Sequence, residues 1–289
     1  MASISAVDEK TGRKFYLDDP DDLKPGEQVV FLLNLHGGGS VGAWQRLYFP
    51  AFDYKEKYRL VVATPSCATK EPMRHWVGEA DDEHLQNIVE YIFATYGKDK
   101  IKSFWLVGHS QGGMTSNRLL GTDFFKKRVD GWLSLSGGRI GPAERSPNAG
   151  RPGAQRPAGS GPPRTATPDC DMSFIYTTGE HEIASLPATS PWAEKYGASP
   201  RVRMPDVVDE EAGRIYDTRG NSTPAWGLLP RPGTAQVFVF PNARDGRVIA
   251  DVVRLDKGHT EGLEAKITEQ LIKLIVAAPG GKVQKVNAS

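Results

Sequence analysis

Apolar runs of strand length alternate along the chain with apolar stripes at helical spacing, and this alternation limits the choice of folds most strongly. Near-continuous apolar strands are buried on both faces, as in a mostly parallel sheet covered by helices. We predict such strands at residues 29–35, 59–63, 103–107, 131–135 and 172–176. Helices are predicted over 85–96 and 263–275, and the runs 236–240 and 248–255 predict a hairpin. The sequence therefore predicts an α/β fold, an open sheet wrapped by helices.

Two segments interrupt this alternation. Residues 139–168 contain five Gly, seven Pro and five Arg, so we expect a mobile surface loop there, either a substrate lid or an inert insertion. Residues 183–235 are rich in Pro, Gly and aromatic residues and are expected to form a small cap or a pocket wall. Neither segment resembles a second core, so we expect residues 1–289 to form a single domain.

Charge and composition argue against several classes of protein. The 36 Lys and Arg nearly balance the 35 Asp and Glu, which is not typical of a nucleic-acid binder. No apolar run approaches the roughly 18 residues of a membrane span, so no membrane partner is expected. The N-terminus lacks a signal-peptide pattern, which predicts a cytoplasmic protein, although a trimmed secreted chain would look the same. Cys67 and Cys170 are too few for a disulfide framework or a structural zinc site.

A candidate nucleophile lies in residues 108–113, which read Gly-His-Ser-Gln-Gly-Gly. They match the G-x-S-x-G pattern, in which a serine occupies a sharp turn between a strand and a helix. Residues 38–42 match as well, around Ser40. Ser110 is the better candidate, because it follows the predicted strand 103–107 directly and precedes a helical pattern at 114–120. Ser40 lies several residues past its strand, inside a glycine run.

That glycine run, residues 35–39 with the sequence Leu-His-Gly-Gly-Gly, follows the first predicted strand. Such a loop presents backbone N–H groups without side chains in the way, which suits a developing oxyanion. We expect one donor from this loop, at Gly38, and a second from the N–H of Gln111, the residue after the candidate nucleophile.

A serine nucleophile needs a base, and His259 is the candidate. It lies on a loop after the last predicted strand and before the last helix, which brings it to the sheet edge where active sites of open α/β sheets collect. His36 and His109 are expected to shape the pocket, and His84 is expected on the surface. An acid should follow a strand between Ser110 and His259, and residues 179–182, Gly-Glu-His-Glu, offer two carboxylates just past a strand end.

With these motifs, the chain resembles the α/β-hydrolase family, specifically the esterase branch of poly(3-hydroxybutyrate) depolymerase-like and feruloyl-esterase-like enzymes. The resemblance spans about residues 29–277 and rests on the motifs at 35–39, 108–113, 179–182 and 258–259. It implies the α/β-hydrolase fold and an acid three residues after a glycine, which is Glu182 here. The family usually has Asp at that position, so Glu180 remains the alternative.

The residues and the resemblance predict a carboxylic-ester hydrolase that works through an acyl-enzyme on Ser110, with no cofactor and no metal. Its substrate would be a small-molecule or oligomeric ester, and Trp44 and Trp76 are expected to bind it as parts of an aromatic wall. A lactonase, thioesterase or peptidase with the same triad stays open, as does a hydrolase-fold protein that binds without turnover. A metal-dependent hydrolase fits least, because no His and carboxylate cluster has ligand spacing.

Overall fold

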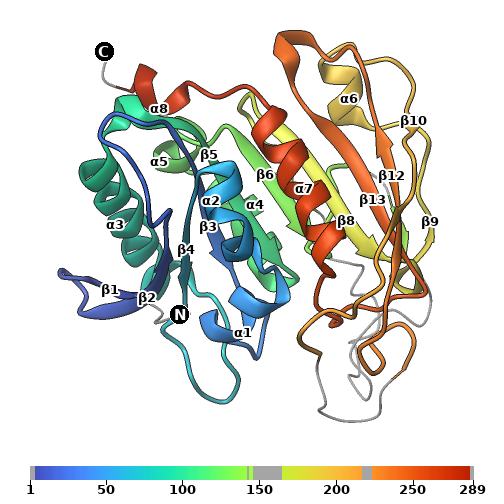
Figure 1. Ribbon diagram of the computed structural model, residues 1–289, viewed down its shortest axis with the longest axis horizontal. Helices are drawn as coiled ribbons and strands as arrows, with labels where there is room; N and C mark the ends of the chain where they lie inside the picture. The colour runs from blue at the N-terminus through green and yellow to red at the C-terminus, as the bar shows by residue number, and fades with distance from the viewer. Residues whose placement is uncertain (1–3, 142, 146–164, 217–222, 287–289) are drawn as a thin grey trace.

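The computed structural model describes residues 4–141, 143–145, 165–216 and 223–286 (Figure 1). Its centre is an eleven-stranded sheet with the order β1-β2-β4-β3-β5-β6-β8-β13-β12-β10, and β11 also pairs with β12. These strands are β1 (Ile4–Asp8), β2 (Arg13–Asp18), β3 (Val29–Leu35), β4 (Leu60–Pro65), β5 (Ile101–His109), β6 (Gly131–Leu135), β8 (Ser173–Gly179), β10 (Val202–Arg203), β11 (Val207–Val208), β12 (Thr234–Val239) and β13 (Ile249–Leu255). A separate pair joins β7 (Glu144–Arg145) to β9 (Ile183–Ser185).

The five predicted strands form the centre of this sheet. Strands β4, β3, β5, β6 and β8 run parallel to one another, and β13 continues the parallel set beside β8. The predicted hairpin is present, since β12 pairs antiparallel with β13. All seven residues of β3 are buried, as expected for a strand covered on both faces. The carboxyl ends of the parallel strands therefore meet at one edge of the sheet.

Helices cover both faces of the sheet (Figure 1). The α-helices are α1 (Gly42–Tyr48), α2 (Lys55–Tyr58), α3 (Gly78–Tyr96), α4 (Gln111–Leu119), α5 (Asp123–Lys126), α6 (Pro191–Lys195), α7 (Ala265–Ala277) and α8 (Lys282–Lys285), with short 3₁₀ turns at η1 (Ala51–Tyr54), η2 (Lys98–Lys100), η3 (Glu180–Glu182) and η4 (Arg244–Gly246). Phe31 and Leu33 of β3 share one hydrophobic cluster with α3. Val30 and Leu32 point the other way, into a second cluster with α1 and α7.

The N-terminal hairpin β1–β2 was not predicted, and it corrects the expectation for His84. This histidine, expected on the surface, is fully buried on α3. Its Nδ1 lies 2.8 Å from Oδ2 of Asp8, the last residue of β1. The prediction was wrong because the hairpin covers a part of α3 that the helical pattern alone leaves open.

The segment expected to be a mobile loop is anchored at its described ends. Arg139 is buried and forms a bidentate ion pair with Asp251 of β13, in which Nε and Nη2 donate to the two carboxylate oxygens at 2.9 and 2.8 Å. Ile140 is buried as well, and the backbone of Ala166 exchanges two hydrogen bonds with the Asn117 side chain. Residues 142 and 146–164 lie outside the described part of the chain, so the mobility of the loop stays a prediction there. Its boundary at Arg139 was wrong, because sequence alone did not reveal this buried partner.

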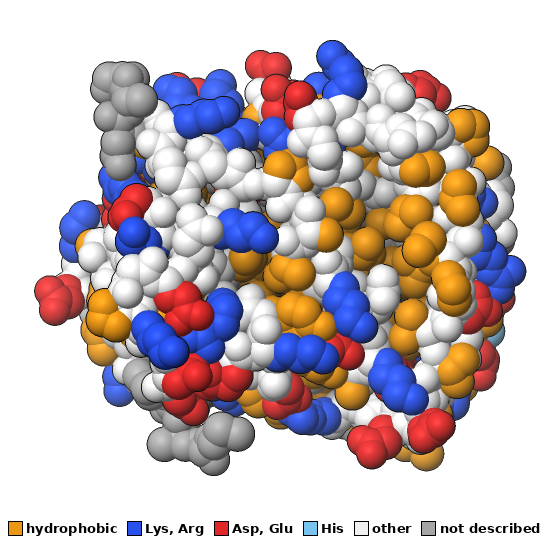
Figure 2. Space-filling model, turned by 45° about the horizontal axis from the view of Figure 1, so that its top comes forward, with side chains coloured by type: hydrophobic (Ala, Val, Ile, Leu, Met, Phe, Trp, Pro, Cys, Tyr) orange, Lys and Arg blue, Asp and Glu red, His pale blue; other side chains and the backbone are white. Residues whose placement is uncertain are grey.

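The segment 183–235 contributes to the core as well as to the surface. Trp192 and Tyr196, on and just after α6, are buried in the same cluster as α3. Figure 2 shows hydrophobic side chains gathering toward the side on which Figure 1 places α6, β10 and β12, while charges of both signs are scattered elsewhere on that face. None of the described helices is long and apolar enough to cross a membrane.

Candidate active site

Ser110 occupies a sharp turn between β5, which ends at His109, and α4, which begins at Gln111. Its backbone angles are φ 51° and ψ −115°, an unfavourable conformation for a residue with a side chain. The flanking glycines explain how the chain tolerates the turn. A Cβ on Gly108 would lie 2.3 Å from the carbonyl carbon of Gly112, and one on Gly112 would lie 2.3 Å from the Leu35 oxygen. The motif is thus enforced by steric contact.

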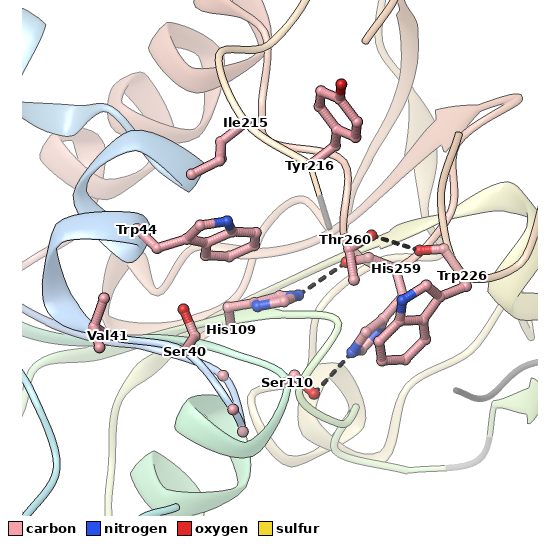
Figure 3. A pocket seen from close by; sticks show the side chains of 13 residues that line it. Ser40, Val41, Trp44, His109, Ser110, Ile215, Tyr216, Trp226, His259 and Thr260 are labelled. Carbon is pink, nitrogen blue, oxygen red and sulfur yellow. Dashed lines mark hydrogen bonds between the residues drawn. The ribbon is translucent and has the colours of Figure 1, made fainter. Parts of the chain in front are cut away.

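The structure brings Ser110, His259 and Glu182 together in one chain of hydrogen bonds. Ser110 Oγ lies 2.8 Å from His259 Nε2, and His259 Nδ1 lies 2.5 Å from Glu182 Oε2 (Figure 3 shows the first contact). Their positions follow from the parallel sheet: the three residues stand past the ends of β5, β13 and β8. A serine hydroxyl, an imidazole and a carboxylate are therefore in contact at one sheet edge, in the order that a Ser-His-acid triad requires.

The Glu182 carboxylate is buried, yet both of its oxygens have donors. Oε1 accepts hydrogen bonds from Ser136 Oγ at 2.6 Å, the Gly179 N–H at 2.9 Å and Thr178 Oγ1 at 3.2 Å. Burial would raise the pKa of Glu182, but the adjacent His259 and these donors together lower it to about 2. The group is thus ionised at neutral pH, ready to hold the Nδ1 proton of His259. The sequence analysis did not identify Ser136 and Thr178, although each lies just past the end of a predicted strand at this edge.

Glu180, the alternative acid, has a different partner. Its Oε2 accepts a hydrogen bond of 2.8 Å from the N–H of Asp256, and the side chain is exposed. Asp256 belongs to the loop that precedes His259. Glu180 therefore supports that loop, while Glu182 contacts the imidazole.

Buried charges hold the loop that carries His259. Arg254, at the end of β13, donates to the carbonyls of Glu261 and Gly262 at 2.7 and 2.8 Å and pairs with Glu264. Lys257 Nζ lies 2.8 Å from the other oxygen of Glu264. Both pairs are almost entirely shielded from solvent. Such a network fixes the two ends of the loop relative to each other.

Replacing Arg254 by methionine should therefore lower the free energy of unfolding by about 3 kcal/mol, because it leaves buried acceptors and part of a buried charge without a partner. Urea denaturation followed by circular dichroism measures the change. Lys57→Met is the matched control, since it removes an exposed ion pair to Glu269 and should change stability little. Equal, small effects of both substitutions would contradict the structural role of Arg254.

The glycine loop lies beside the N-terminus of α4, as an oxyanion hole requires. A Cβ on Gly38 would stand 3.5 Å from Gln111 Oε1, and Gly37, Gly38, Gly39 and Ser110 line the same pocket. The Gly39 N–H donates to the Arg74 carbonyl at 2.7 Å, which leaves Gly38 as the better donor of the two. The first N–H groups of a helix point outward with a partial positive charge, so Gln111 is suited to a developing anion.

Trp76 lies behind this loop, away from the pocket. Its indole nitrogen donates to the His36 carbonyl at 2.8 Å, its ring packs on the His36 ring at 4.6 Å, and its backbone N–H donates to Gln111 Oε1 at 3.2 Å. It is not among the described residues that line the pocket. The expected contact of Trp76 with substrate is therefore corrected: this tryptophan braces the glycine loop and Gln111. The sequence does not indicate which side of the glycine loop a tryptophan contacts, the side that faces the pocket or the side that faces the core.

The pocket beside Ser110 has a volume of about 410 Å³. Figure 3 shows Val41 and Trp44 on one side of the serine, Trp226 beside His259, and Ile215 and Tyr216 above. Trp44 thus takes the wall position that the sequence analysis expected. Ser40, the alternative serine, lines the pocket, and its hydroxyl has no hydrogen-bond partner among the described residues. Trp226 and Tyr216 come from the segment 183–235, so part of that segment forms a pocket wall.

His109 connects the turn at Ser110 to the loop that carries His259, a contact that the sequence motif does not predict. It is buried, and its Nε2 donates to the His259 carbonyl at 2.9 Å. Burial lowers the pKa of His109 to about 3, so it is uncharged at neutral pH. It therefore ties the nucleophile turn to the loop of the base. Within the residues that the structure describes, no three His, Cys, Asp or Glu side chains are grouped to hold a metal ion.

Comparison with known proteins places this site in a known fold. No curated protein matches the sequence. Among solved structures, acetyl xylan esterase from Aspergillus awamori is similar, with a TM-score of 0.55 at 13% identity, over 96% of this chain and 100% of that one. A fluorophosphonate-binding serine hydrolase of Staphylococcus aureus has a TM-score of 0.37 at 16% identity, over 47% of this chain and 56% of that one. Esterase 2 of Thermogutta terrifontis, phosphonylated by sarin, has a TM-score of 0.39 at 13% identity, over 62% and 72%.

At such low identity the first of these structures shows the fold alone. The family itself is shown by the sequence, because residues 29–279 match the family described as "Alpha/beta hydrolase family". That range contains Ser110, Glu182 and His259 and agrees with the resemblance drawn from the motifs. The chain belongs to the alpha/beta hydrolase family.

Proposed function

We propose that this protein is a serine hydrolase that cleaves carboxylic esters through a covalent acyl-enzyme. The observation that carries the proposal is the unbroken path from Ser110 Oγ through His259 to the ionised Glu182, with the serine opening onto a pocket. A protein that only binds a ligand needs no such path. Ester cleavage needs all three groups and an oxyanion site beside them.

The chemistry follows from the geometry. His259 Nε2 accepts the Ser110 proton as Oγ attacks the ester carbonyl, and Glu182 stabilises the resulting imidazolium through Nδ1. The N–H groups of Gly38 and Gln111 donate to the oxyanion, which is worth about 3 kcal/mol per donor in the barrier. The protonated His259 then gives its proton to the departing alcohol. A water molecule, activated by the same histidine, releases the acid and restores Ser110.

The pocket favours an apolar or aromatic group on the ester. Trp44, Trp226 and Ile215 offer apolar surface around the serine, and aromatic walls bind flat or aliphatic groups by excluding water. Within the same triad chemistry, ester, thioester, lactone and amide substrates differ in their leaving groups. We propose esters as the substrates because the motifs resemble those of esterases. The experiment below compares esters with the other three substrate classes.

A fluorophosphonate probe should label the purified protein in a one-to-one ratio at Ser110, because only an activated serine reacts with it. Intact-mass spectrometry and peptide mapping measure the labelling. Hydrolysis rates for p-nitrophenyl esters, thioesters and anilides with the same acyl group, and for lactones of similar chain length, then rank the substrate classes. We expect the esters to be cleaved fastest. A protein that is not labelled, or that prefers the anilides, would contradict the proposed function.

A further inference from the structure

Trp226 is held against the catalytic loop by backbone hydrogen bonds. The His259 N–H donates to the Ala225 carbonyl at 3.1 Å, and the Thr260 N–H donates to the Trp226 carbonyl at 2.8 Å. Thr260 Oγ1 donates to the same Trp226 oxygen at 2.9 Å. The two segments can approach because residue 258 is glycine, where a Cβ would lie 2.3 Å from the Pro224 oxygen. Trp226 is thus hydrogen-bonded to Thr260, the residue after the base, and its neighbour Ala225 is hydrogen-bonded to the backbone of His259.

The indole of Trp226 lies on one face of the His259 ring. The ring centroids are 5.1 Å apart and the planes differ by 28°, a stacked arrangement (Figure 3). The face of a tryptophan attracts a cation within about 6 Å, more strongly than any other aromatic ring does. The indole face is therefore placed to attract the positive charge that His259 gains when it takes the proton of Ser110.

His109 also lies next to the imidazole of His259, with ring centroids 4.9 Å apart and an interplanar angle of 40°. Burial lowers the pKa of His109 to about 3, so it brings no charge to the imidazole at neutral pH. From α1, the Tyr48 hydroxyl donates to the His259 carbonyl at 3.3 Å. The two ring nitrogens of His259 are hydrogen-bonded, Nε2 to Ser110 and Nδ1 to Glu182.

The other charged side chains of this loop also have partners, and Asp256 pairs with His181 and Arg231. Glu261 pairs with Arg231 at 2.8 Å and accepts from the Gly258 N–H at 2.6 Å. Lys257 and Arg254 pair with Glu264. Of the described groups around the ring, Glu182 and the Trp226 face are therefore the ones placed to stabilise a positive charge on His259.

We propose that Trp226 is a positioning residue that stabilises the imidazolium of His259 through its indole face. The inference rests on the proposed function, since it gives Trp226 a part in the proton transfer from Ser110. It goes beyond a role in the pocket wall, because a wall residue acts on substrate binding and leaves the proton affinity of the base unchanged. The two roles predict different responses to pH.

The test is the pH dependence of labelling by a small fluorophosphonate, which needs Ser110 and His259 but fills little of the pocket. Trp226→Leu removes the aromatic face and keeps an apolar side chain. The acid-side midpoint of the labelling rate should then move down by about half a pH unit, because the protonated base has lost support. The plateau rate should fall about threefold. Trp226→Phe, with a weaker aromatic face, should give a smaller shift.

Trp44→Leu is the matched control, because Trp44 lines the same pocket but stacks on Tyr48, 4.9 Å away. It should alter KM for esters and leave the acid-side midpoint in place. A Trp226→Leu midpoint equal to that of the unchanged protein would overturn the inference alone. Should the leucine variant fail to fold, Trp226→Met gives the same comparison. Absence of labelling in the unchanged protein at any pH would instead overturn the proposed function.

Discussion

Replacing Ser110 by alanine should lower kcat for ester hydrolysis by roughly 10⁶-fold. In the proposed reaction Ser110 Oγ forms the acyl-enzyme, and it is the described hydroxyl that contacts His259 Nε2. His259 Nε2 lies 2.8 Å from Ser110 Oγ, so the base would face an empty site. Some acceleration over water should remain, because the backbone donors and the pocket still bind the substrate. Steady-state rates with a p-nitrophenyl ester measure the loss.

Ser40→Ala is the matched control for this substitution. Ser40 lies in the second G-x-S-x-G match and lines the same pocket, yet within the described part of the chain no side chain forms a hydrogen bond with its hydroxyl. Its loss should change kcat by less than about tenfold, the cost of a modified pocket contact. Circular dichroism should show both variants folded. If Ser40→Ala were inactive while Ser110→Ala kept its turnover, the choice between the two serines would be wrong.

Much of the fold was predictable because the central strands are buried on both faces. A run such as residues 29–35 is apolar on both faces of a strand. Such a strand must be covered on both faces, which is typical of a parallel sheet. The same topology explains why three residues distant in sequence could be grouped beforehand. Ser110, Glu182 and His259 each follow a strand of that sheet, and the carboxyl ends of its parallel strands share an edge.

Contacts across the sheet edge were less predictable, because they depend on which side of a loop a side chain takes. Trp44 and Trp76 both follow strand ends, and only the structure shows that Trp44 faces the pocket while Trp76 braces the glycine loop. Buried partners far along the chain gave no signal either. Arg139 was expected in a mobile surface loop, but its partner in the structure is Asp251, 112 residues later in the chain. Local pattern carries no information about such pairs.

Glu182→Gln should lower kcat by about 10⁴-fold, and the structure gives the reason. Three donors converge on Oε1 of Glu182, from Ser136, Thr178 and the Gly179 N–H. In the glutamine variant the amide oxygen is the only group that can accept them, so the NH₂ group must face His259. The amide would then donate to Nδ1 and leave the imidazole proton on Nε2. A histidine in that tautomer cannot accept the proton of Ser110.

Two further variants make this prediction specific. Glu182→Asp should keep partial activity, because the charge survives on a shorter arm that reaches His259 less well. Glu180→Gln should reduce kcat far less than Glu182→Gln does, since Glu180 contacts the Asp256 N–H rather than the imidazole. The three kcat values, measured with one ester at one pH, decide the assignment. A deep loss confined to Glu180→Gln would transfer the orienting role to that residue, and equal, shallow losses would mean that the base is oriented without either carboxylate.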